Sequence, residues 1–218
     1  MLQISHPIML AGMAGVSYAE LVAAVSEAGG YGVLGAGNLT LDEMDAEMCK
    51  TRSLTDKPFG VDLLTPITDN PEQEAQCIID GGASCFVAGL GLPTRVITMC
   101  HDAGLLVFNV CGSVKHARLA EEAGCDAVIA QGTEGGGHTG AVGAMALWPQ
   151  VVDAVKVPVV AAGGLFDGRG LAAALALGCE GVWIGTRFVA AAEARAAGAY
   201  KTALLQAGES DTIISRCW

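Results

Sequence analysis

The sequence has little positive charge and no long apolar run. Lysine and arginine number 12 against 23 aspartates and glutamates, which gives a formal net charge of −11 at pH 7. So acidic a chain is a poor general partner for nucleic acid or for an anionic membrane surface. No run of about 18 apolar residues is present, so no segment is predicted to span a membrane. The first residues lack the basic region and apolar stretch of a signal peptide, and we expect a cytoplasmic protein.

Several common metal and nucleotide motifs are missing as well. None of the eight cysteines belongs to a C-x-x-C pair, which argues against a zinc ribbon or a thioredoxin-type site. The sequence also lacks a His-x-His pair or a carboxylate cluster that would support a catalytic metal. Several cysteines lie in or beside apolar runs, where a thiol behaves as a small hydrophobic group. This usage indicates a reducing compartment.

Glycine and apolar residues are abundant instead. Glycine accounts for 30 of the 218 residues, and hydrophobic residues make up 52% against 16% charged. This balance favours a large buried core and is the opposite of a disordered chain. The length suits one domain, which we assign to residues 1–218. We expect the excess glycine at turns, at helix ends and where backbones approach closely.

Short apolar runs alternate with helical stretches along the chain. The runs are continuous rather than alternating, as expected of parallel strands buried on both faces. Glycines recur at predicted helix ends just before the next strand, which indicates a repeat of βα units. Capping boxes are predicted at Ser17 and Thr40, and N-caps at Asn70, Ser113 and Asp167. The eight predicted strands are residues 7–11, 31–35, 58–63, 85–88, 105–110, 127–130, 158–162 and 181–185.

Eight strands in strict alternation with helices predict an α/β fold, the (β/α)8 TIM barrel. A doubly wound open sheet is the alternative, but it predicts a G-x-G-x-x-G after the first strand, and this is absent. A helix over residues 189–207 is expected to cover the last strand. In such a barrel the functional site lies at the C-terminal ends of the strands.

The loops after predicted strands seven and eight have the composition of a phosphate site. Gly163 and Gly164 follow one strand, and Gly185 and Thr186 follow the next. Small residues let backbone N–H groups reach phosphate oxygens, and a threonine hydroxyl adds a donor. Tight turns alone would also account for these glycines.

Two further loops point to a flat ligand and to proton transfer. In the loop after strand six, Gly136 and Gly137 allow close backbone approach, and His138 is suited to general acid–base work near neutral pH. A flexible loop with a surface histidine is the alternative. After strand one, small residues surround Met13, which suits a ring lying against backbone or simply a core methionine in a tight turn. The other histidines, His6, His101 and His116, are interpreted as structural.

Motifs at residues 7–15, 89–93, 130–140, 158–170 and 185–188 resemble, in the same order, those of the nitronate monooxygenase family. These enzymes, formerly called 2-nitropropane dioxygenases, are FMN-dependent (β/α)8 proteins related to flavin-dependent enoyl-ACP reductases. The resemblance implies FMN as cofactor, and a nitronate and molecular oxygen as substrates that give a carbonyl compound and nitrite. It implies that His138 faces the substrate. The implied cofactor-binding residues are Ala11, Gly12, Met13, Asp62, Gln131, Gly136, Gly137, Gly163, Gly164, Gly185 and Thr186.

The sequence departs from the family pattern in three places. Gly12 replaces the usual proline, and Asp62 replaces the usual asparagine. A carboxylate at position 62 disfavours reduced, anionic flavin unless it is protonated or paired. Family members usually continue beyond Trp218 into a small second domain over the active site. We therefore expect a barrel shortened at its C-terminus without that domain, whose uncovered flank favours a homodimer.

Other functions stay open. An FMN- and NAD(P)H-dependent enoyl-ACP or quinone reductase is the first alternative, although Lys115, Arg169 and Arg187 are few for an acidic acyl-ACP partner. A catalytically impaired flavin-binding short form is the second. A phosphosugar isomerase on the same barrel is more distant, because it would not need the loop that carries His138.

Overall fold

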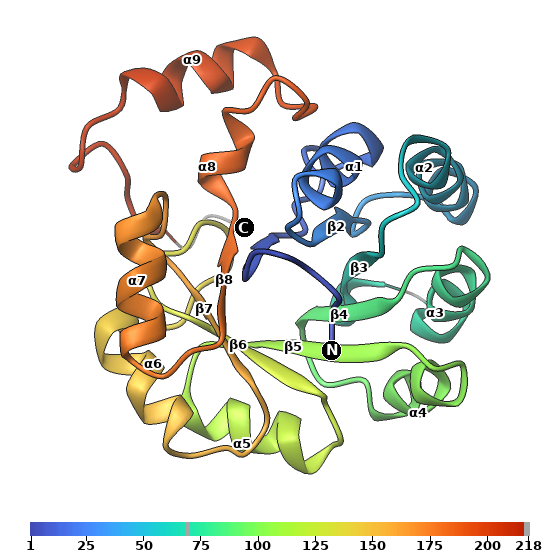
Figure 1. The fold of residues 1–218 in the computed structure, drawn as a ribbon, viewed down its shortest axis with the longest axis horizontal. Helices are drawn as coiled ribbons and strands as arrows, with labels where there is room; N and C mark the ends of the chain where they lie inside the picture. Colours follow the sequence, from blue (N-terminus) through green and yellow to red (C-terminus); the bar gives the residue numbers. More distant parts are fainter. Residues whose placement is uncertain (69, 216–218) are drawn as a thin grey trace.

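The computed structural model describes residues 1–68 and 70–215, and eight parallel strands form a nearly closed barrel within them (Figure 1). The hydrogen-bonded order is β1-β8-β7-β6-β5-β4-β3-β2. A single parallel bridge between Met9 and Tyr31 joins the two end strands. The strands are β1 (Ile8–Leu10), β2 (Gly32–Gly35), β3 (Phe59–Leu64), β4 (Cys85–Leu90), β5 (Leu106–Cys111), β6 (Ala127–Gln131), β7 (Val159–Ala162) and β8 (Gly181–Ile184).

Helices follow the strands and surround the barrel (Figure 1). The predicted TIM barrel and all eight predicted strands are confirmed, with each end within two residues of its expected place. The helices are α1 (Ala19–Glu27), α2 (Leu41–Leu54), α3 (Pro71–Asp80), α4 (Thr94–Asp102), α5 (Val114–Glu122), α6 (Ala144–Val152), α7 (Gly168–Ala176), α8 (Thr186–Val189) and α9 (Gly198–Gln206), with a 3-10 turn, η1, at Thr65–Ile67.

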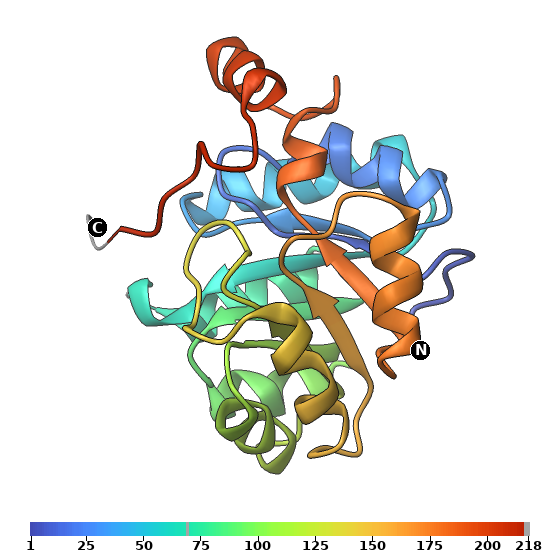
Figure 2. The ribbon, with the colours of Figure 1, turned by 90° about the vertical axis from the view of Figure 1, so that its left-hand side faces the viewer.

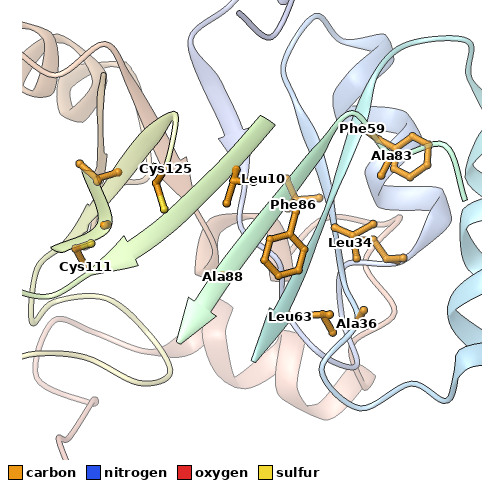
Figure 3. Packing of buried hydrophobic residues seen from close by; sticks show 14 of the residues in the cluster. Leu10, Leu34, Ala36, Phe59, Leu63, Ala83, Phe86, Ala88, Cys111 and Cys125 are labelled. Carbon is orange, nitrogen blue, oxygen red and sulfur yellow. The ribbon is translucent and has the colours of Figure 1, made fainter. Parts of the chain in front are cut away.

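The buried side chains form two layers. Side chains such as Met9, Tyr31 and Phe108 fill the barrel interior. A larger layer lies between the strands and the helices, and Figure 3 shows part of it around Phe59 and Phe86. Each fully buried side chain of this size contributes about 1.5–3 kcal/mol. The strands are therefore covered on both faces, which accounts for their continuous apolar sequences.

The predicted helix starts are confirmed except at α1. Thr40 forms the expected capping box with Glu43, and Asn70, Ser113 and Asp167 cap their helices. The Ser17 prediction is wrong, because its hydroxyl accepts a hydrogen bond from the Met13 N–H at 2.7 Å. The Glu47 carboxylate of α2 instead accepts from the first N–H of α1, at Ala19, over 3.0 Å. Ser17 thus holds the loop after β1, where the chain turns into the barrel mouth.

The helix predicted over residues 189–207 is also wrong. The segment divides into α8 and α9, and α9 has no buried residue and lies apart from the barrel (Figure 2). Between the two helices the Arg195 guanidinium binds Glu47 at 2.7 Å and Glu20 at 3.2 Å. These contacts direct the chain toward α1 and α2 and away from a continuous helix. No helix within the described residues is long and apolar enough to cross a membrane.

Candidate functional site

The ends of β1 and β8 meet at the mouth of the barrel. Ile8 to Leu10 pair in register with Val182 to Ile184, which brings the loops that follow together. A Cβ atom placed on Gly185 would lie 3.4 Å from the Met13 sulfur and 3.5 Å from Ala11 Cβ. The structure therefore brings the predicted ring-contacting loop against one of the predicted phosphate loops.

The loop after β6 lies against the other predicted phosphate residues. A Cβ atom on Gly136 would be 3.4 Å from Thr186 Oγ1, and one on Gly164 would be 3.3 Å from Glu134 Cβ. The Glu134 carboxylate accepts a hydrogen bond of 2.8 Å from the Ala144 N–H at the start of α6. Glu134 therefore anchors this loop, which contacts the loops of both β7 and β8.

Gly163 and Gly164 have backbone conformations that favour glycine. Their φ angles are +103° and +70°, in the left-handed region that side chains rarely adopt. A Cβ on Gly163 would also lie 3.0 Å from the carbonyl oxygen of Gly132. The turn itself thus requires both glycines, and the same turn leaves the backbone without side chains where a phosphate is predicted.

Gln131 and His138 border a cavity at the ends of β4, β5 and β6. The Gln131 amide donates a hydrogen bond of 2.8 Å to the His138 carbonyl oxygen, which closes the glycine loop onto its own strand. The cavity is about 400 Å³ and is lined by both residues, with Gly89 and Val110 among the others. His138 is exposed at the rim, in position to meet a molecule that enters the cavity.

The cavity also includes a histidine that the sequence interpretation treated as structural. His116, in the first turn of α5, lines it together with Leu119 of the same helix and Leu92 of the loop after β4. The sequence signal was available, because a residue three positions after the Ser113 cap belongs to the first helical turn at the barrel mouth. By contrast, His101 pairs with Asp126 at 3.0 Å and lies outside this cavity.

Asp62 has an unusual environment. Its residue is 8% exposed, and its Oδ1 has no hydrogen bond of ordinary geometry to any described residue. Burial raises the pKa of the carboxyl group to about 8, and the backbone N–H of Gly89 offsets only part of this effect. A Cβ atom on Gly12 would overlap the Asp62 side chain and lie 2.5 Å from Oδ2. The two substituted positions, Gly12 and Asp62, therefore contact each other.

The described cysteines do not supply reactive thiols to this site. The seven described cysteines are free, and burial raises the pKa of Cys100, Cys111 and Cys125 to about 12. Such thiols stay protonated and unreactive at neutral pH. Among residues 1–68 and 70–215, no cluster of three or more histidine, cysteine or carboxylate side chains could hold a metal ion.

Comparison with known proteins gives consistent relatives. The model of the family described as nitronate monooxygenase matches residues 1–218. A "(3aS,4S,5R,7aS)-5-hydroxy-7a-methyl-1-oxo-octahydro-1H-indene-4-carboxyl-CoA dehydrogenase" of Rhodococcus jostii (strain RHA1) is 43% identical over 215 residues. That match covers 98% of this chain and 60% of the relative, so the chain spans well under two thirds of that protein. A probable nitronate monooxygenase of Staphylococcus saprophyticus is 36% identical, with 99% of this chain and 74% of the relative covered.

Solved structures show the same fold. FabK from Thermotoga maritima superposes with a TM-score of 0.94 at 42% identity, over 97% of this chain and 68% of that one. A nitroalkane oxidase from Streptomyces ansochromogenes superposes with a TM-score of 0.87 at 35% identity, over 92% of this chain and 71% of that one.

Proposed function

This chain belongs to the nitronate monooxygenase family, and from that premise we propose that it is an FMN-dependent oxidoreductase that converts alkyl nitronates and oxygen into carbonyl compounds and nitrite. The family supports a flavin, and FMN as the particular flavin is part of the proposal. The substrate is likewise proposed, since the chain spans 60% of the length of the first relative above.

One observation carries the proposal. The loop after β6 contacts the predicted phosphate residues at Gly136, beside Thr186, and lines the cavity at His138. The loop after β6 therefore borders both the proposed cofactor site and the proposed substrate cavity. This adjacency is what a redox enzyme needs, because the protein must hold the reactive part of the cofactor against its substrate.

The residues present fit a flavin in two respects. Backbone without side chains lines the mouth at Gly163, Gly164 and Gly185, which suits the phosphate and its hydrogen bonds to N–H groups. The buried Asp62 carboxyl group adjoins the loop that carries Met13, and its Oδ1 has no hydrogen bond of ordinary geometry to any described residue. In the proposal, Thr186 adds a hydroxyl donor to the phosphate, and Ala11, Gly12 and Met13 lie along the ring system. Gln131 and Gly137 also border the flavin in the proposal.

The bound flavin supplies the electron-accepting chemistry. The chain's own contribution is made at the cavity. The His138 imidazole is a donor on both nitrogens when protonated, so it attracts an anionic nitro oxygen, and when neutral it accepts a proton. Apolar side chains at Leu90, Leu92 and Val110 surround the substrate and exclude water, which strengthens this electrostatic attraction.

A second function is favoured by the same cavity. Leu90, Leu92, Val110 and Leu119 form an apolar lining large enough for an acyl group, and the similar proteins include FabK and a carboxyl-CoA dehydrogenase. The FMN- and NAD(P)H-dependent enoyl-ACP or quinone reductase is therefore the alternative. It differs in the electron donor, because a nicotinamide rather than the substrate reduces the flavin.

The test is to reconstitute the purified protein with FMN and record its visible spectrum without oxygen. In the proposed function a nitronate bleaches the flavin, and NADH does so slowly or not at all. Bleaching by NADH alone would replace the proposal with the reductase. Bound FMN that neither compound bleaches would support the catalytically impaired flavin-binding alternative, and a protein that cannot retain FMN would overturn the proposed flavin site itself.

A further inference from the structure

Asp62 points into the barrel interior near its mouth. On β3, Phe59, Val61 and Leu63 pack outward against the helices. Alternation places Asp62 on the opposite face, and its register partners are Gly35 on β2 and Val87 on β4.

Glycine backbone packs against the Asp62 carboxyl group on two sides. Gly12, in the loop after β1, leaves room on the Oδ2 side, and a Cβ atom on Gly89 would lie 2.6 Å from Oδ1. Gly89 also lines the cavity, and Gly12 adjoins Met13. The carboxyl group therefore lies between the predicted ring-contacting loop and the substrate cavity.

No basic group within the described part of the chain compensates the Asp62 carboxyl group. Among the residues that the structure describes, no lysine, arginine or histidine forms an ion pair with Asp62. The titratable neighbours inside the barrel are Cys85 on β4 and Tyr31, just before β2, and burial raises the pKa of both groups far above neutral. The side chains of β1 and its loop, Met9, Ala11 and Met13, carry no charge. An ionised carboxylate in such a place is strongly disfavoured, whereas a neutral acid is tolerated and has a proton to donate.

We propose that Asp62 is held as a neutral carboxylic acid and donates a hydrogen bond to an acceptor atom of the bound flavin ring. This inference rests on the proposed flavin site and adds a proton to it. The ring offers carbonyl oxygens and unprotonated nitrogens, and both accept hydrogen bonds. Oδ1 of Asp62 is buried against Gly89, whereas Oδ2 lies beside Gly12, in the loop on which the ring is expected to rest, so the proton is donated from Oδ2. Closely packed glycines let the ring approach without a side chain in between.

The proposal makes flavin binding depend on pH. In the apoprotein the pKa of Asp62 is about 8, and a hydrogen bond to the flavin raises it further in the complex. Above pH 8, binding must first return a proton to Asp62. Affinity for FMN then falls about tenfold for each pH unit. Below pH 8 the acid is already protonated, and affinity does not depend on this group.

The experiment compares FMN dissociation constants from pH 6 to pH 10, measured by flavin fluorescence in the wild type and two variants. Asp62→Asn has the same shape, keeps an N–H donor and does not titrate. Asp153→Asn makes the same change at an exposed position that ends α6. We expect the wild type and Asp153→Asn to lose affinity steeply above pH 8, while Asp62→Asn stays level. The ionisations of FMN itself are common to all three proteins and cancel in the comparison.

Proton uptake gives a second readout without catalysis. Calorimetry of FMN binding at pH 9 in two buffers of different ionisation enthalpy should show close to one more proton taken up by the wild type than by Asp62→Asn. Equal uptake, or the same pH dependence in both proteins, would overturn the role of Asp62. If the expected pH pattern appears but no nitronate is oxidised, the proposed reaction fails and this inference stands. If none of the three proteins binds FMN, both fail.

Discussion

The amide of Gln131, the last residue of β6, holds the backbone carbonyl of His138 at 2.8 Å across the glycine loop. The hydrogen bond fixes the place from which His138 reaches the cavity, because the intervening glycines supply little rigidity of their own. Gln131 was expected to bind the flavin. The contact present in the structure gives it a separate task, which is to position the histidine.

Gln131→Glu should separate this positioning from cofactor binding. A carboxylate cannot donate to the His138 carbonyl and repels it, so the loop loses its anchor. Turnover of a nitronate should fall about tenfold to a hundredfold, as expected for a displaced catalytic group. FMN affinity should stay within about threefold, a change worth well under the 1.4 kcal/mol of a tenfold effect. Steady-state kinetics and FMN titration measure both, and a loss confined to FMN affinity would assign Gln131 to the flavin instead.

His138→Ala should lower turnover far more than it weakens FMN binding. General acid–base groups contribute about a hundredfold to ten-thousandfold to the rate. FMN binding should change little, because His138 lies at the cavity rim beyond the predicted phosphate loops. His101→Ala is the matched control, because that histidine pairs with Asp126 and does not line the cavity. The control should keep its turnover. Equal losses of rate and FMN affinity in His138→Ala would argue against a catalytic role.

Gly185→Val should abolish FMN binding and leave the fold intact. The φ of Gly185 is −105°, which a side chain can adopt, and its Cβ would make only ordinary contacts with Met13 and Ala11. The added methyl groups would occupy the space predicted for the phosphate. Gly198→Val, at the start of exposed α9, is the control. Absorbance of the bound flavin and thermal unfolding are the measurements, and a stable yellow Gly185→Val protein would move the phosphate elsewhere. The corresponding Gly164→Val change should also remove FMN, but its φ of +70° adds backbone strain.

The contact between Gly12 and Asp62 can be tested without any cofactor. Gly12→Ala should destabilise the protein by about 1–3 kcal/mol, because the new methyl group overlaps the buried carboxyl side chain. In an Asp62→Gly background, which also removes the Asp62 Cβ atom that would lie 2.2 Å from the added methyl group, the same change should cost much less. Urea unfolding of the two single variants and the double variant gives the coupling energy. Additive effects would show that the two residues do not contact each other in solution.

The stability of the apoprotein should also depend on Asp62. Its pKa is about 8 in the folded protein and 3.8 when unperturbed, so between these values the folded state holds a proton that the unfolded state has lost. Asp62 is therefore least costly below pH 4, and stability falls as pH rises toward 8, by about 1.4 kcal/mol per unit. Asp62→Asn should remove this slope and be the more stable protein at pH 8. Urea unfolding at several pH values measures the difference, and parallel curves would contradict the raised pKa.

Sequence patterns predicted most of this fold because both faces of each strand are buried. Continuous apolar runs that follow glycine helix ends, such as those at Gly104 and Gly124, are typical of parallel βα units, and all eight strands were found. Errors arose where distant contacts decide the local structure. Ser17 bonds the Met13 N–H, and Glu47 of α2 accepts from the first N–H of α1 in its place. Arg195 draws the chain across to α2. No local pattern contains such partners.

The glycines of the candidate site and His138 could be predicted from the sequence. Residues that directly follow a strand lie at the C-terminal end of the barrel. The contribution of His116 could not be predicted, because three neighbouring βα units form the cavity and no single motif describes it. The meeting of Gly12 with Asp62 could not be predicted from their separate positions, one after β1 and the other on β3. Only the packed interior shows that one leaves room for the other.

The pairing of β1 with β8 also determines the order in which the molecule can be assembled. These are the first and last strands of the described sequence, and pairing between segments so distant along a chain is slow, because the intervening loop must first be closed. The loops that carry Met13 and Gly185 meet only when this pairing is made. A nascent chain therefore cannot complete the proposed flavin site until its eighth strand is in place, and binding of the cofactor would report that the barrel has closed.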